Sequence, residues 1–204
     1  ITLTVAVARF EMTIPLESDG PAQWIMPNAG GGGYYRWSVS PQMMATMAEN
    51  GTELLEVTER VNIIGNVSSL LDAGAISGDD YLHTLNHFAD DPDPRVISAM
   101  LAGLDKVNNA FVTPELSDEF SMYVRRTLGP ALKRFGLQTR PGEDEEVTRF
   151  RPQLIRWLGE EGHDPVVLGY ADSLAKVYMY DPTAIDPAMI TTSAEITSVA
   201  VRTP

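Results

Sequence analysis

Large apolar residues occupy every second position at the start of the chain, from Ile1 to Val7. A period of two is typical of a strand with one buried face, so this segment is predicted to be a strand. Segments 23–26 and 34–39 are short and rich in aromatic residues, and they predict two more strands. Asn28 and the glycines at 30–33 lie between them and favour a tight reversal. Three strands are few for an independent sheet, so we expect this portion to belong to a larger β domain.

From Pro41 onward the apolar residues recur at steps of three and four, which is the period of amphipathic helices. The longest such run extends from Leu54 to Leu71 and is predicted to end at Gly74. Ser77 is expected to start the next helix, and the prolines within 91–94 to separate it from the one that follows. Further helices are expected at about 96–104, 114–135, 143–162, 165–179 and 187–201.

Helices of this length, joined by short turns rich in Pro, Gly and Asp, predict stacked antiparallel helix pairs. No strict repeat of fixed period is visible. The predicted fold class is therefore mainly α, an α-solenoid-like arrangement preceded by a small β-sandwich portion. The change of pattern near 40–51 divides the chain into a β portion at 1–45 and an all-α domain at 46–204, which we expect to be incomplete.

Composition narrows the classes of partner. The chain has 204 residues, of which 44% are hydrophobic, and this is enough to bury a good core. Its net charge of −13 opposes binding to nucleic acid or to anionic lipid. No apolar run approaches the roughly 20 residues that span a bilayer. The chain has no Cys, which excludes disulfides and thiolate metal sites and leaves the compartment open.

The most specific local strings are Trp-Ile-Met-Pro-Asn at 24–28 and Gly-Tyr-Tyr-Arg-Trp at 33–37, followed by the helical segment 59–74 with its Glu-Arg start and Ala-Gly end. In this order they resemble the alanyl aminopeptidase family of zinc metallopeptidases (gluzincins), at the end of its β-sandwich domain and the start of its helical domain. Two departures are the run of four glycines and Asn66, where relatives usually place an Asp. Taken alone, the first two strings also fit a generic β-hairpin.

The resemblance implies a zinc site made by His-Glu-x-x-His and a Glu from the next helix, in which the first Glu is the general base. No such string occurs in this chain, so no catalytic, metal or cofactor-binding residue is assigned to it. The resemblance further implies that zinc lies in the parent protein's catalytic domain. The helical domain would close over that active site and restrict the access of peptides. The expected partners are thus the parent's own catalytic domain and its peptide substrate.

The nearest approach to a metal motif is the pair His83 and His87, which share one helix face, although Thr84 stands where a base would be needed. Asp80 and Asp90 lie near that face, so one interpretation is a weak adventitious Zn or Ni site. The favoured interpretation is two solvent-facing histidines on an ordinary amphipathic helix, because two ligands without a third and fourth often occur by chance.

Other chemistry-bearing residues are given structural interpretations. His163 is interpreted as a turn residue between helices, and the acidic run 143–146 as a helix start that complements the macrodipole. The arginines scatter along the helices and are expected to be solvated or paired with the surplus carboxylates. The methionines at 43, 44 and 47 are expected to fill irregular contacts at the domain junction.

Two other classes of function stay open. The first is a stand-alone helical-repeat module that binds a protein partner, and the second is a metal-dependent enzyme that uses His83 and His87. The segment 185–204 resembles one more helix of the family's domain with others to follow. A truncated edge of this kind should expose apolar surface, so self-association through it is a further hypothesis.

Overall fold

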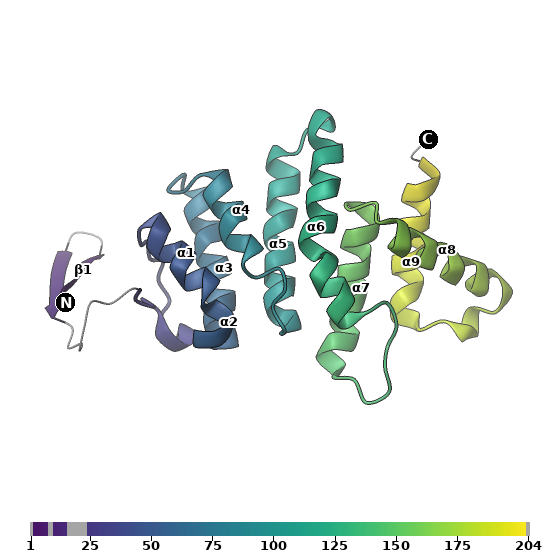
Figure 1. The fold of residues 1–204 in the computed structure, drawn as a ribbon, viewed down its shortest axis with the longest axis horizontal. Coiled ribbons are helices and arrows are strands. Elements are labelled where there is room, and N and C mark those ends of the chain that lie inside the picture. The colour runs from purple at the N-terminus through teal and green to yellow at the C-terminus, as the bar shows by residue number, and fades with distance from the viewer. Residues whose placement is uncertain (1, 8–9, 16–23, 203–204) are drawn as a thin grey trace.

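The structure, a computed structural model, describes residues 2–7, 10–15 and 24–202 and is mainly helical, as predicted (Figure 1). Its helices in chain order are α1 (Pro41–Glu49), α2 (Gly51–Leu54), α3 (Val57–Asp72), α4 (Gly78–Asn86), α5 (Pro94–Phe111), α6 (Ser117–Phe135), α7 (Glu145–Glu160), α8 (Pro165–Tyr180) and α9 (Pro187–Arg202). Short 3-10 turns are η1 (Ala29–Gly31), η2 (Pro114–Leu116) and η3 (Pro182–Ala184).

The N-terminal alternation does form a strand. Strand β1 (Thr2–Val7) pairs antiparallel with β2 (Phe10–Pro15), so that Thr2 lies opposite Pro15 and Val7 lies opposite Phe10. The prediction of a first strand is therefore confirmed for Thr2–Val7, and β2 was not predicted. A β-sandwich portion is not seen among the described residues, where these two strands form a two-stranded sheet.

The two other strand predictions are wrong where they can be examined. Residues 24–26 and 34–39 form no strand, and Gln23 lies outside the described residues. Around 33–37, side chains rather than a neighbouring strand satisfy the backbone. Asn28 bonds to the backbone of Gly33, and Asn66 bonds to the backbone of Trp37.

The predicted helix from Leu54 to Leu71 is interrupted near its start. Leu55 and Glu56 are extended and separate α2 from α3. The Leu55 carbonyl accepts a hydrogen bond from Arg60 Nη1 at 2.6 Å, and the Glu56 N–H donates to Glu59 Oε2 at 2.9 Å. Because side chains of the first turn of α3 take up these groups, α3 begins at Val57 with its own cap.

Several helix ends lie where the local signals placed them. Gly74 follows α3 with a φ of +65°, a conformation that glycine adopts without strain. Ser77 Oγ accepts from the Asp80 N–H at 3.1 Å and caps α4. Asp93 caps α5 by accepting from the Arg95 N–H at 2.9 Å, and Pro94 occupies the first turn.

The chain runs along the long axis of the molecule from α1 to α7, and α8 and α9 lie together at the far end (Figure 1). Helices α3, α5, α7 and α9 contact each other in series, and α4, α6 and α8 pack against members of this row. One continuous core runs through them and includes the fully buried Ile63, Tyr81, Leu104, Leu128 and Leu154. Each helix therefore contacts its near neighbours, which is the arrangement of a solenoid.

Candidate functional site

Helix α3 presents a polar docking face, which we define as Glu59, Asn62 and Asn66. The spacing of three and four residues places these side chains on one side of the helix. The face holds the segment 28–37, which lies about 30 residues earlier in the sequence. Glu59 Oε1 accepts from the Gly30 N–H at 2.8 Å, and Asn62 Oδ1 accepts from Asn28 Nδ2 at 3.3 Å.

Two asparagines bind this segment in the same way. Asn66 Oδ1 accepts from the Trp37 N–H at 3.1 Å, and Asn66 Nδ2 donates to the Trp37 carbonyl at 2.7 Å. Asn28 likewise accepts from the Gly33 N–H at 2.8 Å and donates to the Gly33 carbonyl at 3.0 Å. Both amides are buried, so each replaces the pair of hydrogen bonds that a neighbouring strand would have supplied.

The turn held in this way projects aromatic residues outward. The Tyr35 hydroxyl donates to the Pro27 carbonyl at 2.5 Å, and its ring lies across Gly33, where an added Cβ would be 2.0 Å from Tyr35 Cε1. A larger residue at position 33 would require the Tyr35 ring to move. Tyr34 is fully exposed, while Trp37 is buried in the core. The segment is thus anchored at Trp37 and displays Tyr34 to solvent.

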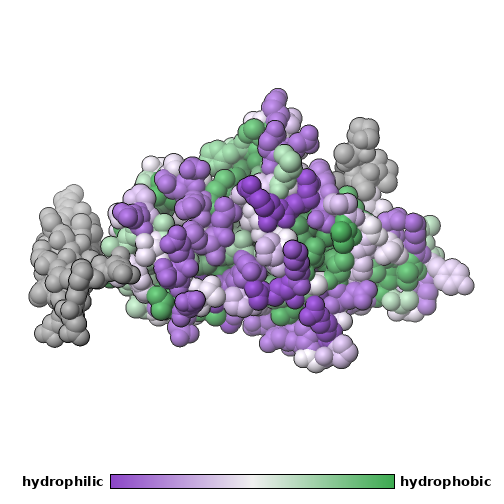
Figure 2. All heavy atoms as spheres, in the orientation of Figure 1, coloured by the Kyte–Doolittle hydropathy of each residue, from purple (hydrophilic) through white to green (hydrophobic). Residues whose placement is uncertain are grey.

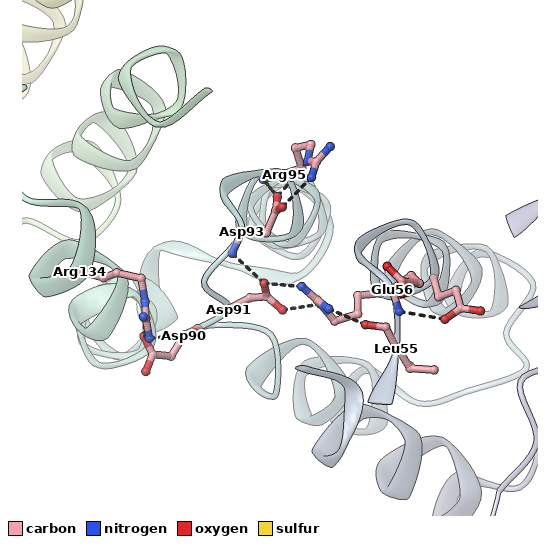
Figure 3. Close-up of polar contacts among 9 residues, drawn as sticks. Leu55, Glu56, Asp90, Asp91, Asp93, Arg95 and Arg134 are labelled. Carbon is pink, nitrogen blue, oxygen red and sulfur yellow. Dashed lines mark hydrogen bonds and ion pairs between the residues drawn. The ribbon is translucent and has the colours of Figure 1, made fainter. Parts of the chain in front are cut away.

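Arg60, which follows Glu59 on α3, forms a buried ion pair with Asp91. Arg60 Nε is 2.7 Å from Asp91 Oδ2, and Arg60 Nη2 donates to Asp91 Oδ1 at 3.1 Å. The two side chains are 6% and 0% exposed. Asp91 Oδ1 also accepts from the Asp93 N–H at 2.9 Å, as Figure 3 shows. The pair therefore fixes the start of α3 to the start of α5, and its charges are satisfied by each other and by backbone groups.

Two further ion pairs flank this buried pair (Figure 3). Arg95 and Asp93 pair at 2.7 Å, and Arg134 on α6 reaches Asp90 at 2.9 Å. The hydrogen bond from Arg95 lowers the pKa of Asp93. These contacts agree with the prediction that arginines pair with surplus carboxylates.

His83 and His87 lie on α4 with ring centroids 5.0 Å apart and nearly perpendicular. His83 is exposed, as predicted, but His87 is partly buried, and its Nε2 has no hydrogen-bond partner in the part of the chain that the structure describes. Burial lowers the pKa of His87, and the neighbouring His83 lowers it further. Within residues 24–198, whose side chains are described, no group of three His, Asp or Glu side chains could hold a metal ion.

His163 lies in the turn between α7 and α8, where it was predicted, and has a φ of +45°. Its Nδ1 is 3.4 Å from Ser121 Oγ, a long contact to a buried hydroxyl. Arg125 of α6 donates to the Gly162 carbonyl in the same turn. Asp164 then caps α8 by accepting from the Val166 and Val167 N–H groups. These contacts give His163 a structural place at a helix junction.

The acidic run 143–146 has two roles. Asp144 Oδ1 accepts from the Glu146 N–H at 2.7 Å and caps α7, as the macrodipole argument predicts. Glu143 instead pairs with Arg151, whose side chain is buried. That hydrogen bond lowers the pKa of Glu143. Arg151 is thus paired with a carboxylate, as predicted for the arginines, but its side chain is buried, and it holds the loop between α6 and α7.

The predicted filler methionines contribute to the core. Met44 and Met47 of α1 are buried, and Met43 is partly buried.

A cavity of about 110 Å³ lies between Arg151, Tyr170 and Asp186. The Arg151 guanidinium donates to Glu143, to the Phe135 carbonyl and to Thr139. These partners engage its N–H groups, so we assign no ligand to it in this cavity.

Comparison with known proteins identifies the family of this chain. The family described as ERAP1-like C-terminal domain matches residues 24–202. The chain belongs to this family. The match includes both the segment held on α3 and the whole row of helices, and it confirms the resemblance to the C-terminal region of the alanyl aminopeptidases.

Curated relatives of this ERAP1-like domain are named as aminopeptidases. The puromycin-sensitive aminopeptidase of Caenorhabditis elegans is 23% identical over 185 residues, which is 82% of this chain and 19% of that protein. Aminopeptidases M1-C and M1-D of Oryza sativa subsp. japonica are 24% and 25% identical, over 71% of this chain and 17% of each of them. The chain thus spans about a fifth of the length of these relatives. Within the described residues, no helix has the length and apolar character needed to cross a membrane.

Proposed function

We propose that this chain is the non-catalytic C-terminal part of a zinc-dependent aminopeptidase that releases N-terminal amino acids from peptides. Its helical domain caps the active site and restricts substrate access. The observation that carries the proposal is the family match over residues 24–202, together with the lack of a His-Glu-x-x-His string anywhere in the sequence. The names of the relatives support the parent activity.

In this proposal the zinc and the general base belong to the parent's catalytic domain. Zinc polarises the scissile carbonyl and activates water there, and the present chain supplies neither ligand nor base. We also propose the domain division into a β portion at 1–45 and a helical domain at 46–204. The β1–β2 hairpin supports the first portion, and the helices from α2 to α9 support the second.

The coding region upstream of Ile1 provides the first test. An in-frame His-Glu-x-x-His with its trailing Glu supports the proposal, and an unrelated domain would contradict it. The purified chain should release no aminoacyl arylamide product. Chelator-sensitive hydrolysis by the chain alone would overturn its non-catalytic assignment.

The capping role needs a separate measurement. We expect the parent enzyme lacking its helical domain to cleave long peptides better, relative to a dipeptide arylamide, than the intact enzyme does. An unchanged ratio between the two substrates would show that the helical domain does not restrict access.

The alternative is a helical-repeat module that binds a protein partner. The serial contact of α3, α5, α7 and α9 favours it, because such rows offer extended binding surfaces. Self-association through the edge formed by the segment 185–204 is a further proposal.

A further inference from the structure

Helix α1 packs against α4 through a small contact. Three of its nine residues, Met44, Met47 and Ala48, are buried. A cavity of about 40 Å³ lies between the two helices, and His83 and Thr84 of α4 line it together with Met44. The contact therefore buries few side chains and is incompletely filled. Segments with few buried apolar contacts open locally at a lower free energy than the rest of a fold.

The segment that contains α1 is held by α3 at both of its ends. Before α1, both backbone groups of Trp37 bond to Asn66, and after it the Leu55 carbonyl accepts from Arg60. These hydrogen bonds are buried and involve neither α1 nor α4. Residues 38–54 can thus separate from α4 as one segment while their ends stay attached to the helical row.

His87 is poorly placed to hold a proton while α1 is packed on α4. Its Nε2 is enclosed and has no hydrogen-bond partner among the residues that the structure describes. The ring of His83 lies one helical turn away, with its centroid 5.0 Å from that of His87. A protonated imidazole has two N–H donors and needs an acceptor for each. Protonation of His87 would therefore bury an N–H without an acceptor and place its charge beside a second imidazole.

The charges around His87 act in both directions. Burial lowers its pKa most, the neighbouring His83 lowers it further, and Glu49 at the end of α1 raises it. Glu49 offsets only part of the penalty, so the neutral form of His87 is favoured while α1 is in place. Charged side chains of α3, α5 and α6, which also contact α4, are held in the ion pairs Arg60–Asp91, Lys106–Asp72 and Arg134–Asp90.

We propose that the α1–α4 contact is a pH-sensitive device, in which protonation of His87 separates the segment 38–54 from α4 and exposes Met44 and Met47. Water then solvates the imidazolium, and the bonds at Trp37 and Leu55 keep the segment attached. Because the open form binds the proton more readily than the closed form, acid favours opening. This inference does not depend on the aminopeptidase assignment.

Hydrogen exchange measures this opening. Protection factors correct for the intrinsic pH dependence of exchange. Those of the α1 amides should be lower than those of α5, and they should fall from about pH 7.5 to about pH 5.5. One proton and an ordinary histidine pKa of about 6.5 in the open form limit this fall to about tenfold.

A general effect of acid has the opposite sign. The net charge is −13, and hydrophilic side chains are spread along the row of helices (Figure 2). Acid lowers the self-repulsion of such a surface and so favours the folded state. The α8 amides, which can open locally without exposing His87, should therefore show no fall in protection over the same pH range.

Variants at two of the three histidines identify the source of the fall. His87→Gln and His87→Phe both remove the titrating group, and each should abolish the fall in the protection of α1. The matched control is His163→Gln at the α7–α8 turn, which should leave the fall unchanged. The ratio of protection factors at the two pH values is compared within each variant, so a general loss of stability cancels. Circular dichroism checks that the helices are retained.

Three results would overturn the proposal. The first is equal protection of α1 at the two pH values in the unaltered chain. The second is a fall that persists in both His87 variants. The third is protection of α1 as strong as that of α5, because α1 would then open only when the whole domain unfolds.

Discussion

Helices α3 and α8 have the same length of 16 residues and lie at opposite ends of the helical row. Helix α3 buries six of its residues, including Arg60 and Asn66, whereas α8 buries Val167 and Ala171. The exposed side of α8 is nevertheless rich in apolar residues. Burial in this fold therefore depends on which segments pack against a helix more than on how apolar the helix is.

The difference has an energetic consequence. The polar groups of α3 contact backbone and charge partners in a protected environment, where an unpaired group carries a large penalty. The polar groups of α8 lie in water, where an ion pair contributes little. Substitutions of similar chemistry should thus have very different effects on the two helices.

The largest effect is expected for Asp91→Ala. It leaves the Arg60 guanidinium buried without a counter-charge, which typically destabilises a protein by about 3–5 kcal/mol. Denaturant unfolding followed by circular dichroism measures the change. A double variant, Arg60→Met with Asp91→Leu, should recover much of the loss because no charge is then buried. Equal loss in the single and double variants would show that packing, rather than charge, is responsible.

Asn66→Leu should have the next largest effect. It removes both hydrogen bonds to Trp37 and leaves buried backbone groups unsatisfied. The free energy of unfolding should fall by about 1–3 kcal/mol. Asn66→Asp keeps the acceptor for the Trp37 N–H but sets a carboxylate against the Trp37 carbonyl, so it should also destabilise. The control Asn109→Ala, at an exposed position on α5, should change stability by less than about 0.5 kcal/mol. An Asn66 variant as stable as this control would contradict the role of the docking face.

His87 on α4 should give a smaller effect that depends on pH. Its pKa is lowered in the folded protein, mainly by burial, so the unfolded chain takes up the proton more readily. The free energy of unfolding should therefore fall as the pH drops below about 6.5, and this loss should stop once the folded protein is also protonated. His87→Gln should reduce the loss between about pH 7 and pH 5. An unaltered pH profile would exclude His87 as its source.

The smallest effect is expected on α8. Lys176→Ala removes an exposed i to i+4 pair, and the free energy of unfolding at low protein concentration should change by at most about 0.5 kcal/mol. A loss as large as that of Asp91→Ala would erase the contrast between α3 and α8. It would mean that α8 is held by contacts stronger than its exposure indicates.

The helical part of the fold could be predicted because its signals are local. Ser77, Pro94 and Gly74 mark helix ends through their own side chains or backbone conformation, and they act there as predicted. Of the strands predicted at 23–26 and 34–39, the described residues form none, and in the second segment Asn66 of α3 overrides local preference at Trp37. Their aromatic composition is real, yet the partner that satisfies the Gly33 and Trp37 backbone is an amide side chain.

A sequence signal for the docking face was nevertheless present. Glu59, Asn62 and Asn66 share one side of a helix whose other side is apolar.

The burial of Arg60 also had a sequence signal. Arg60 recurs with Ile63, Ile64 and Val67 at helical spacing, which places a charged residue among buried ones. Such an arginine requires a carboxylate partner, but the sequence alone does not select Asp91. The partial burial of His87 was missed for a similar reason, because α1 packs against α4.

The serial contacts of α3, α5, α7 and α9 also bear on how the chain is made. Each of these helices packs against the next member of the row, so its contacts are close in sequence. Domains of this kind gain structure stepwise, because one unit can pack before the following unit exists. During synthesis, α1 to α5 can close around the Arg60–Asp91 pair while α8 and α9 are still inside the ribosome.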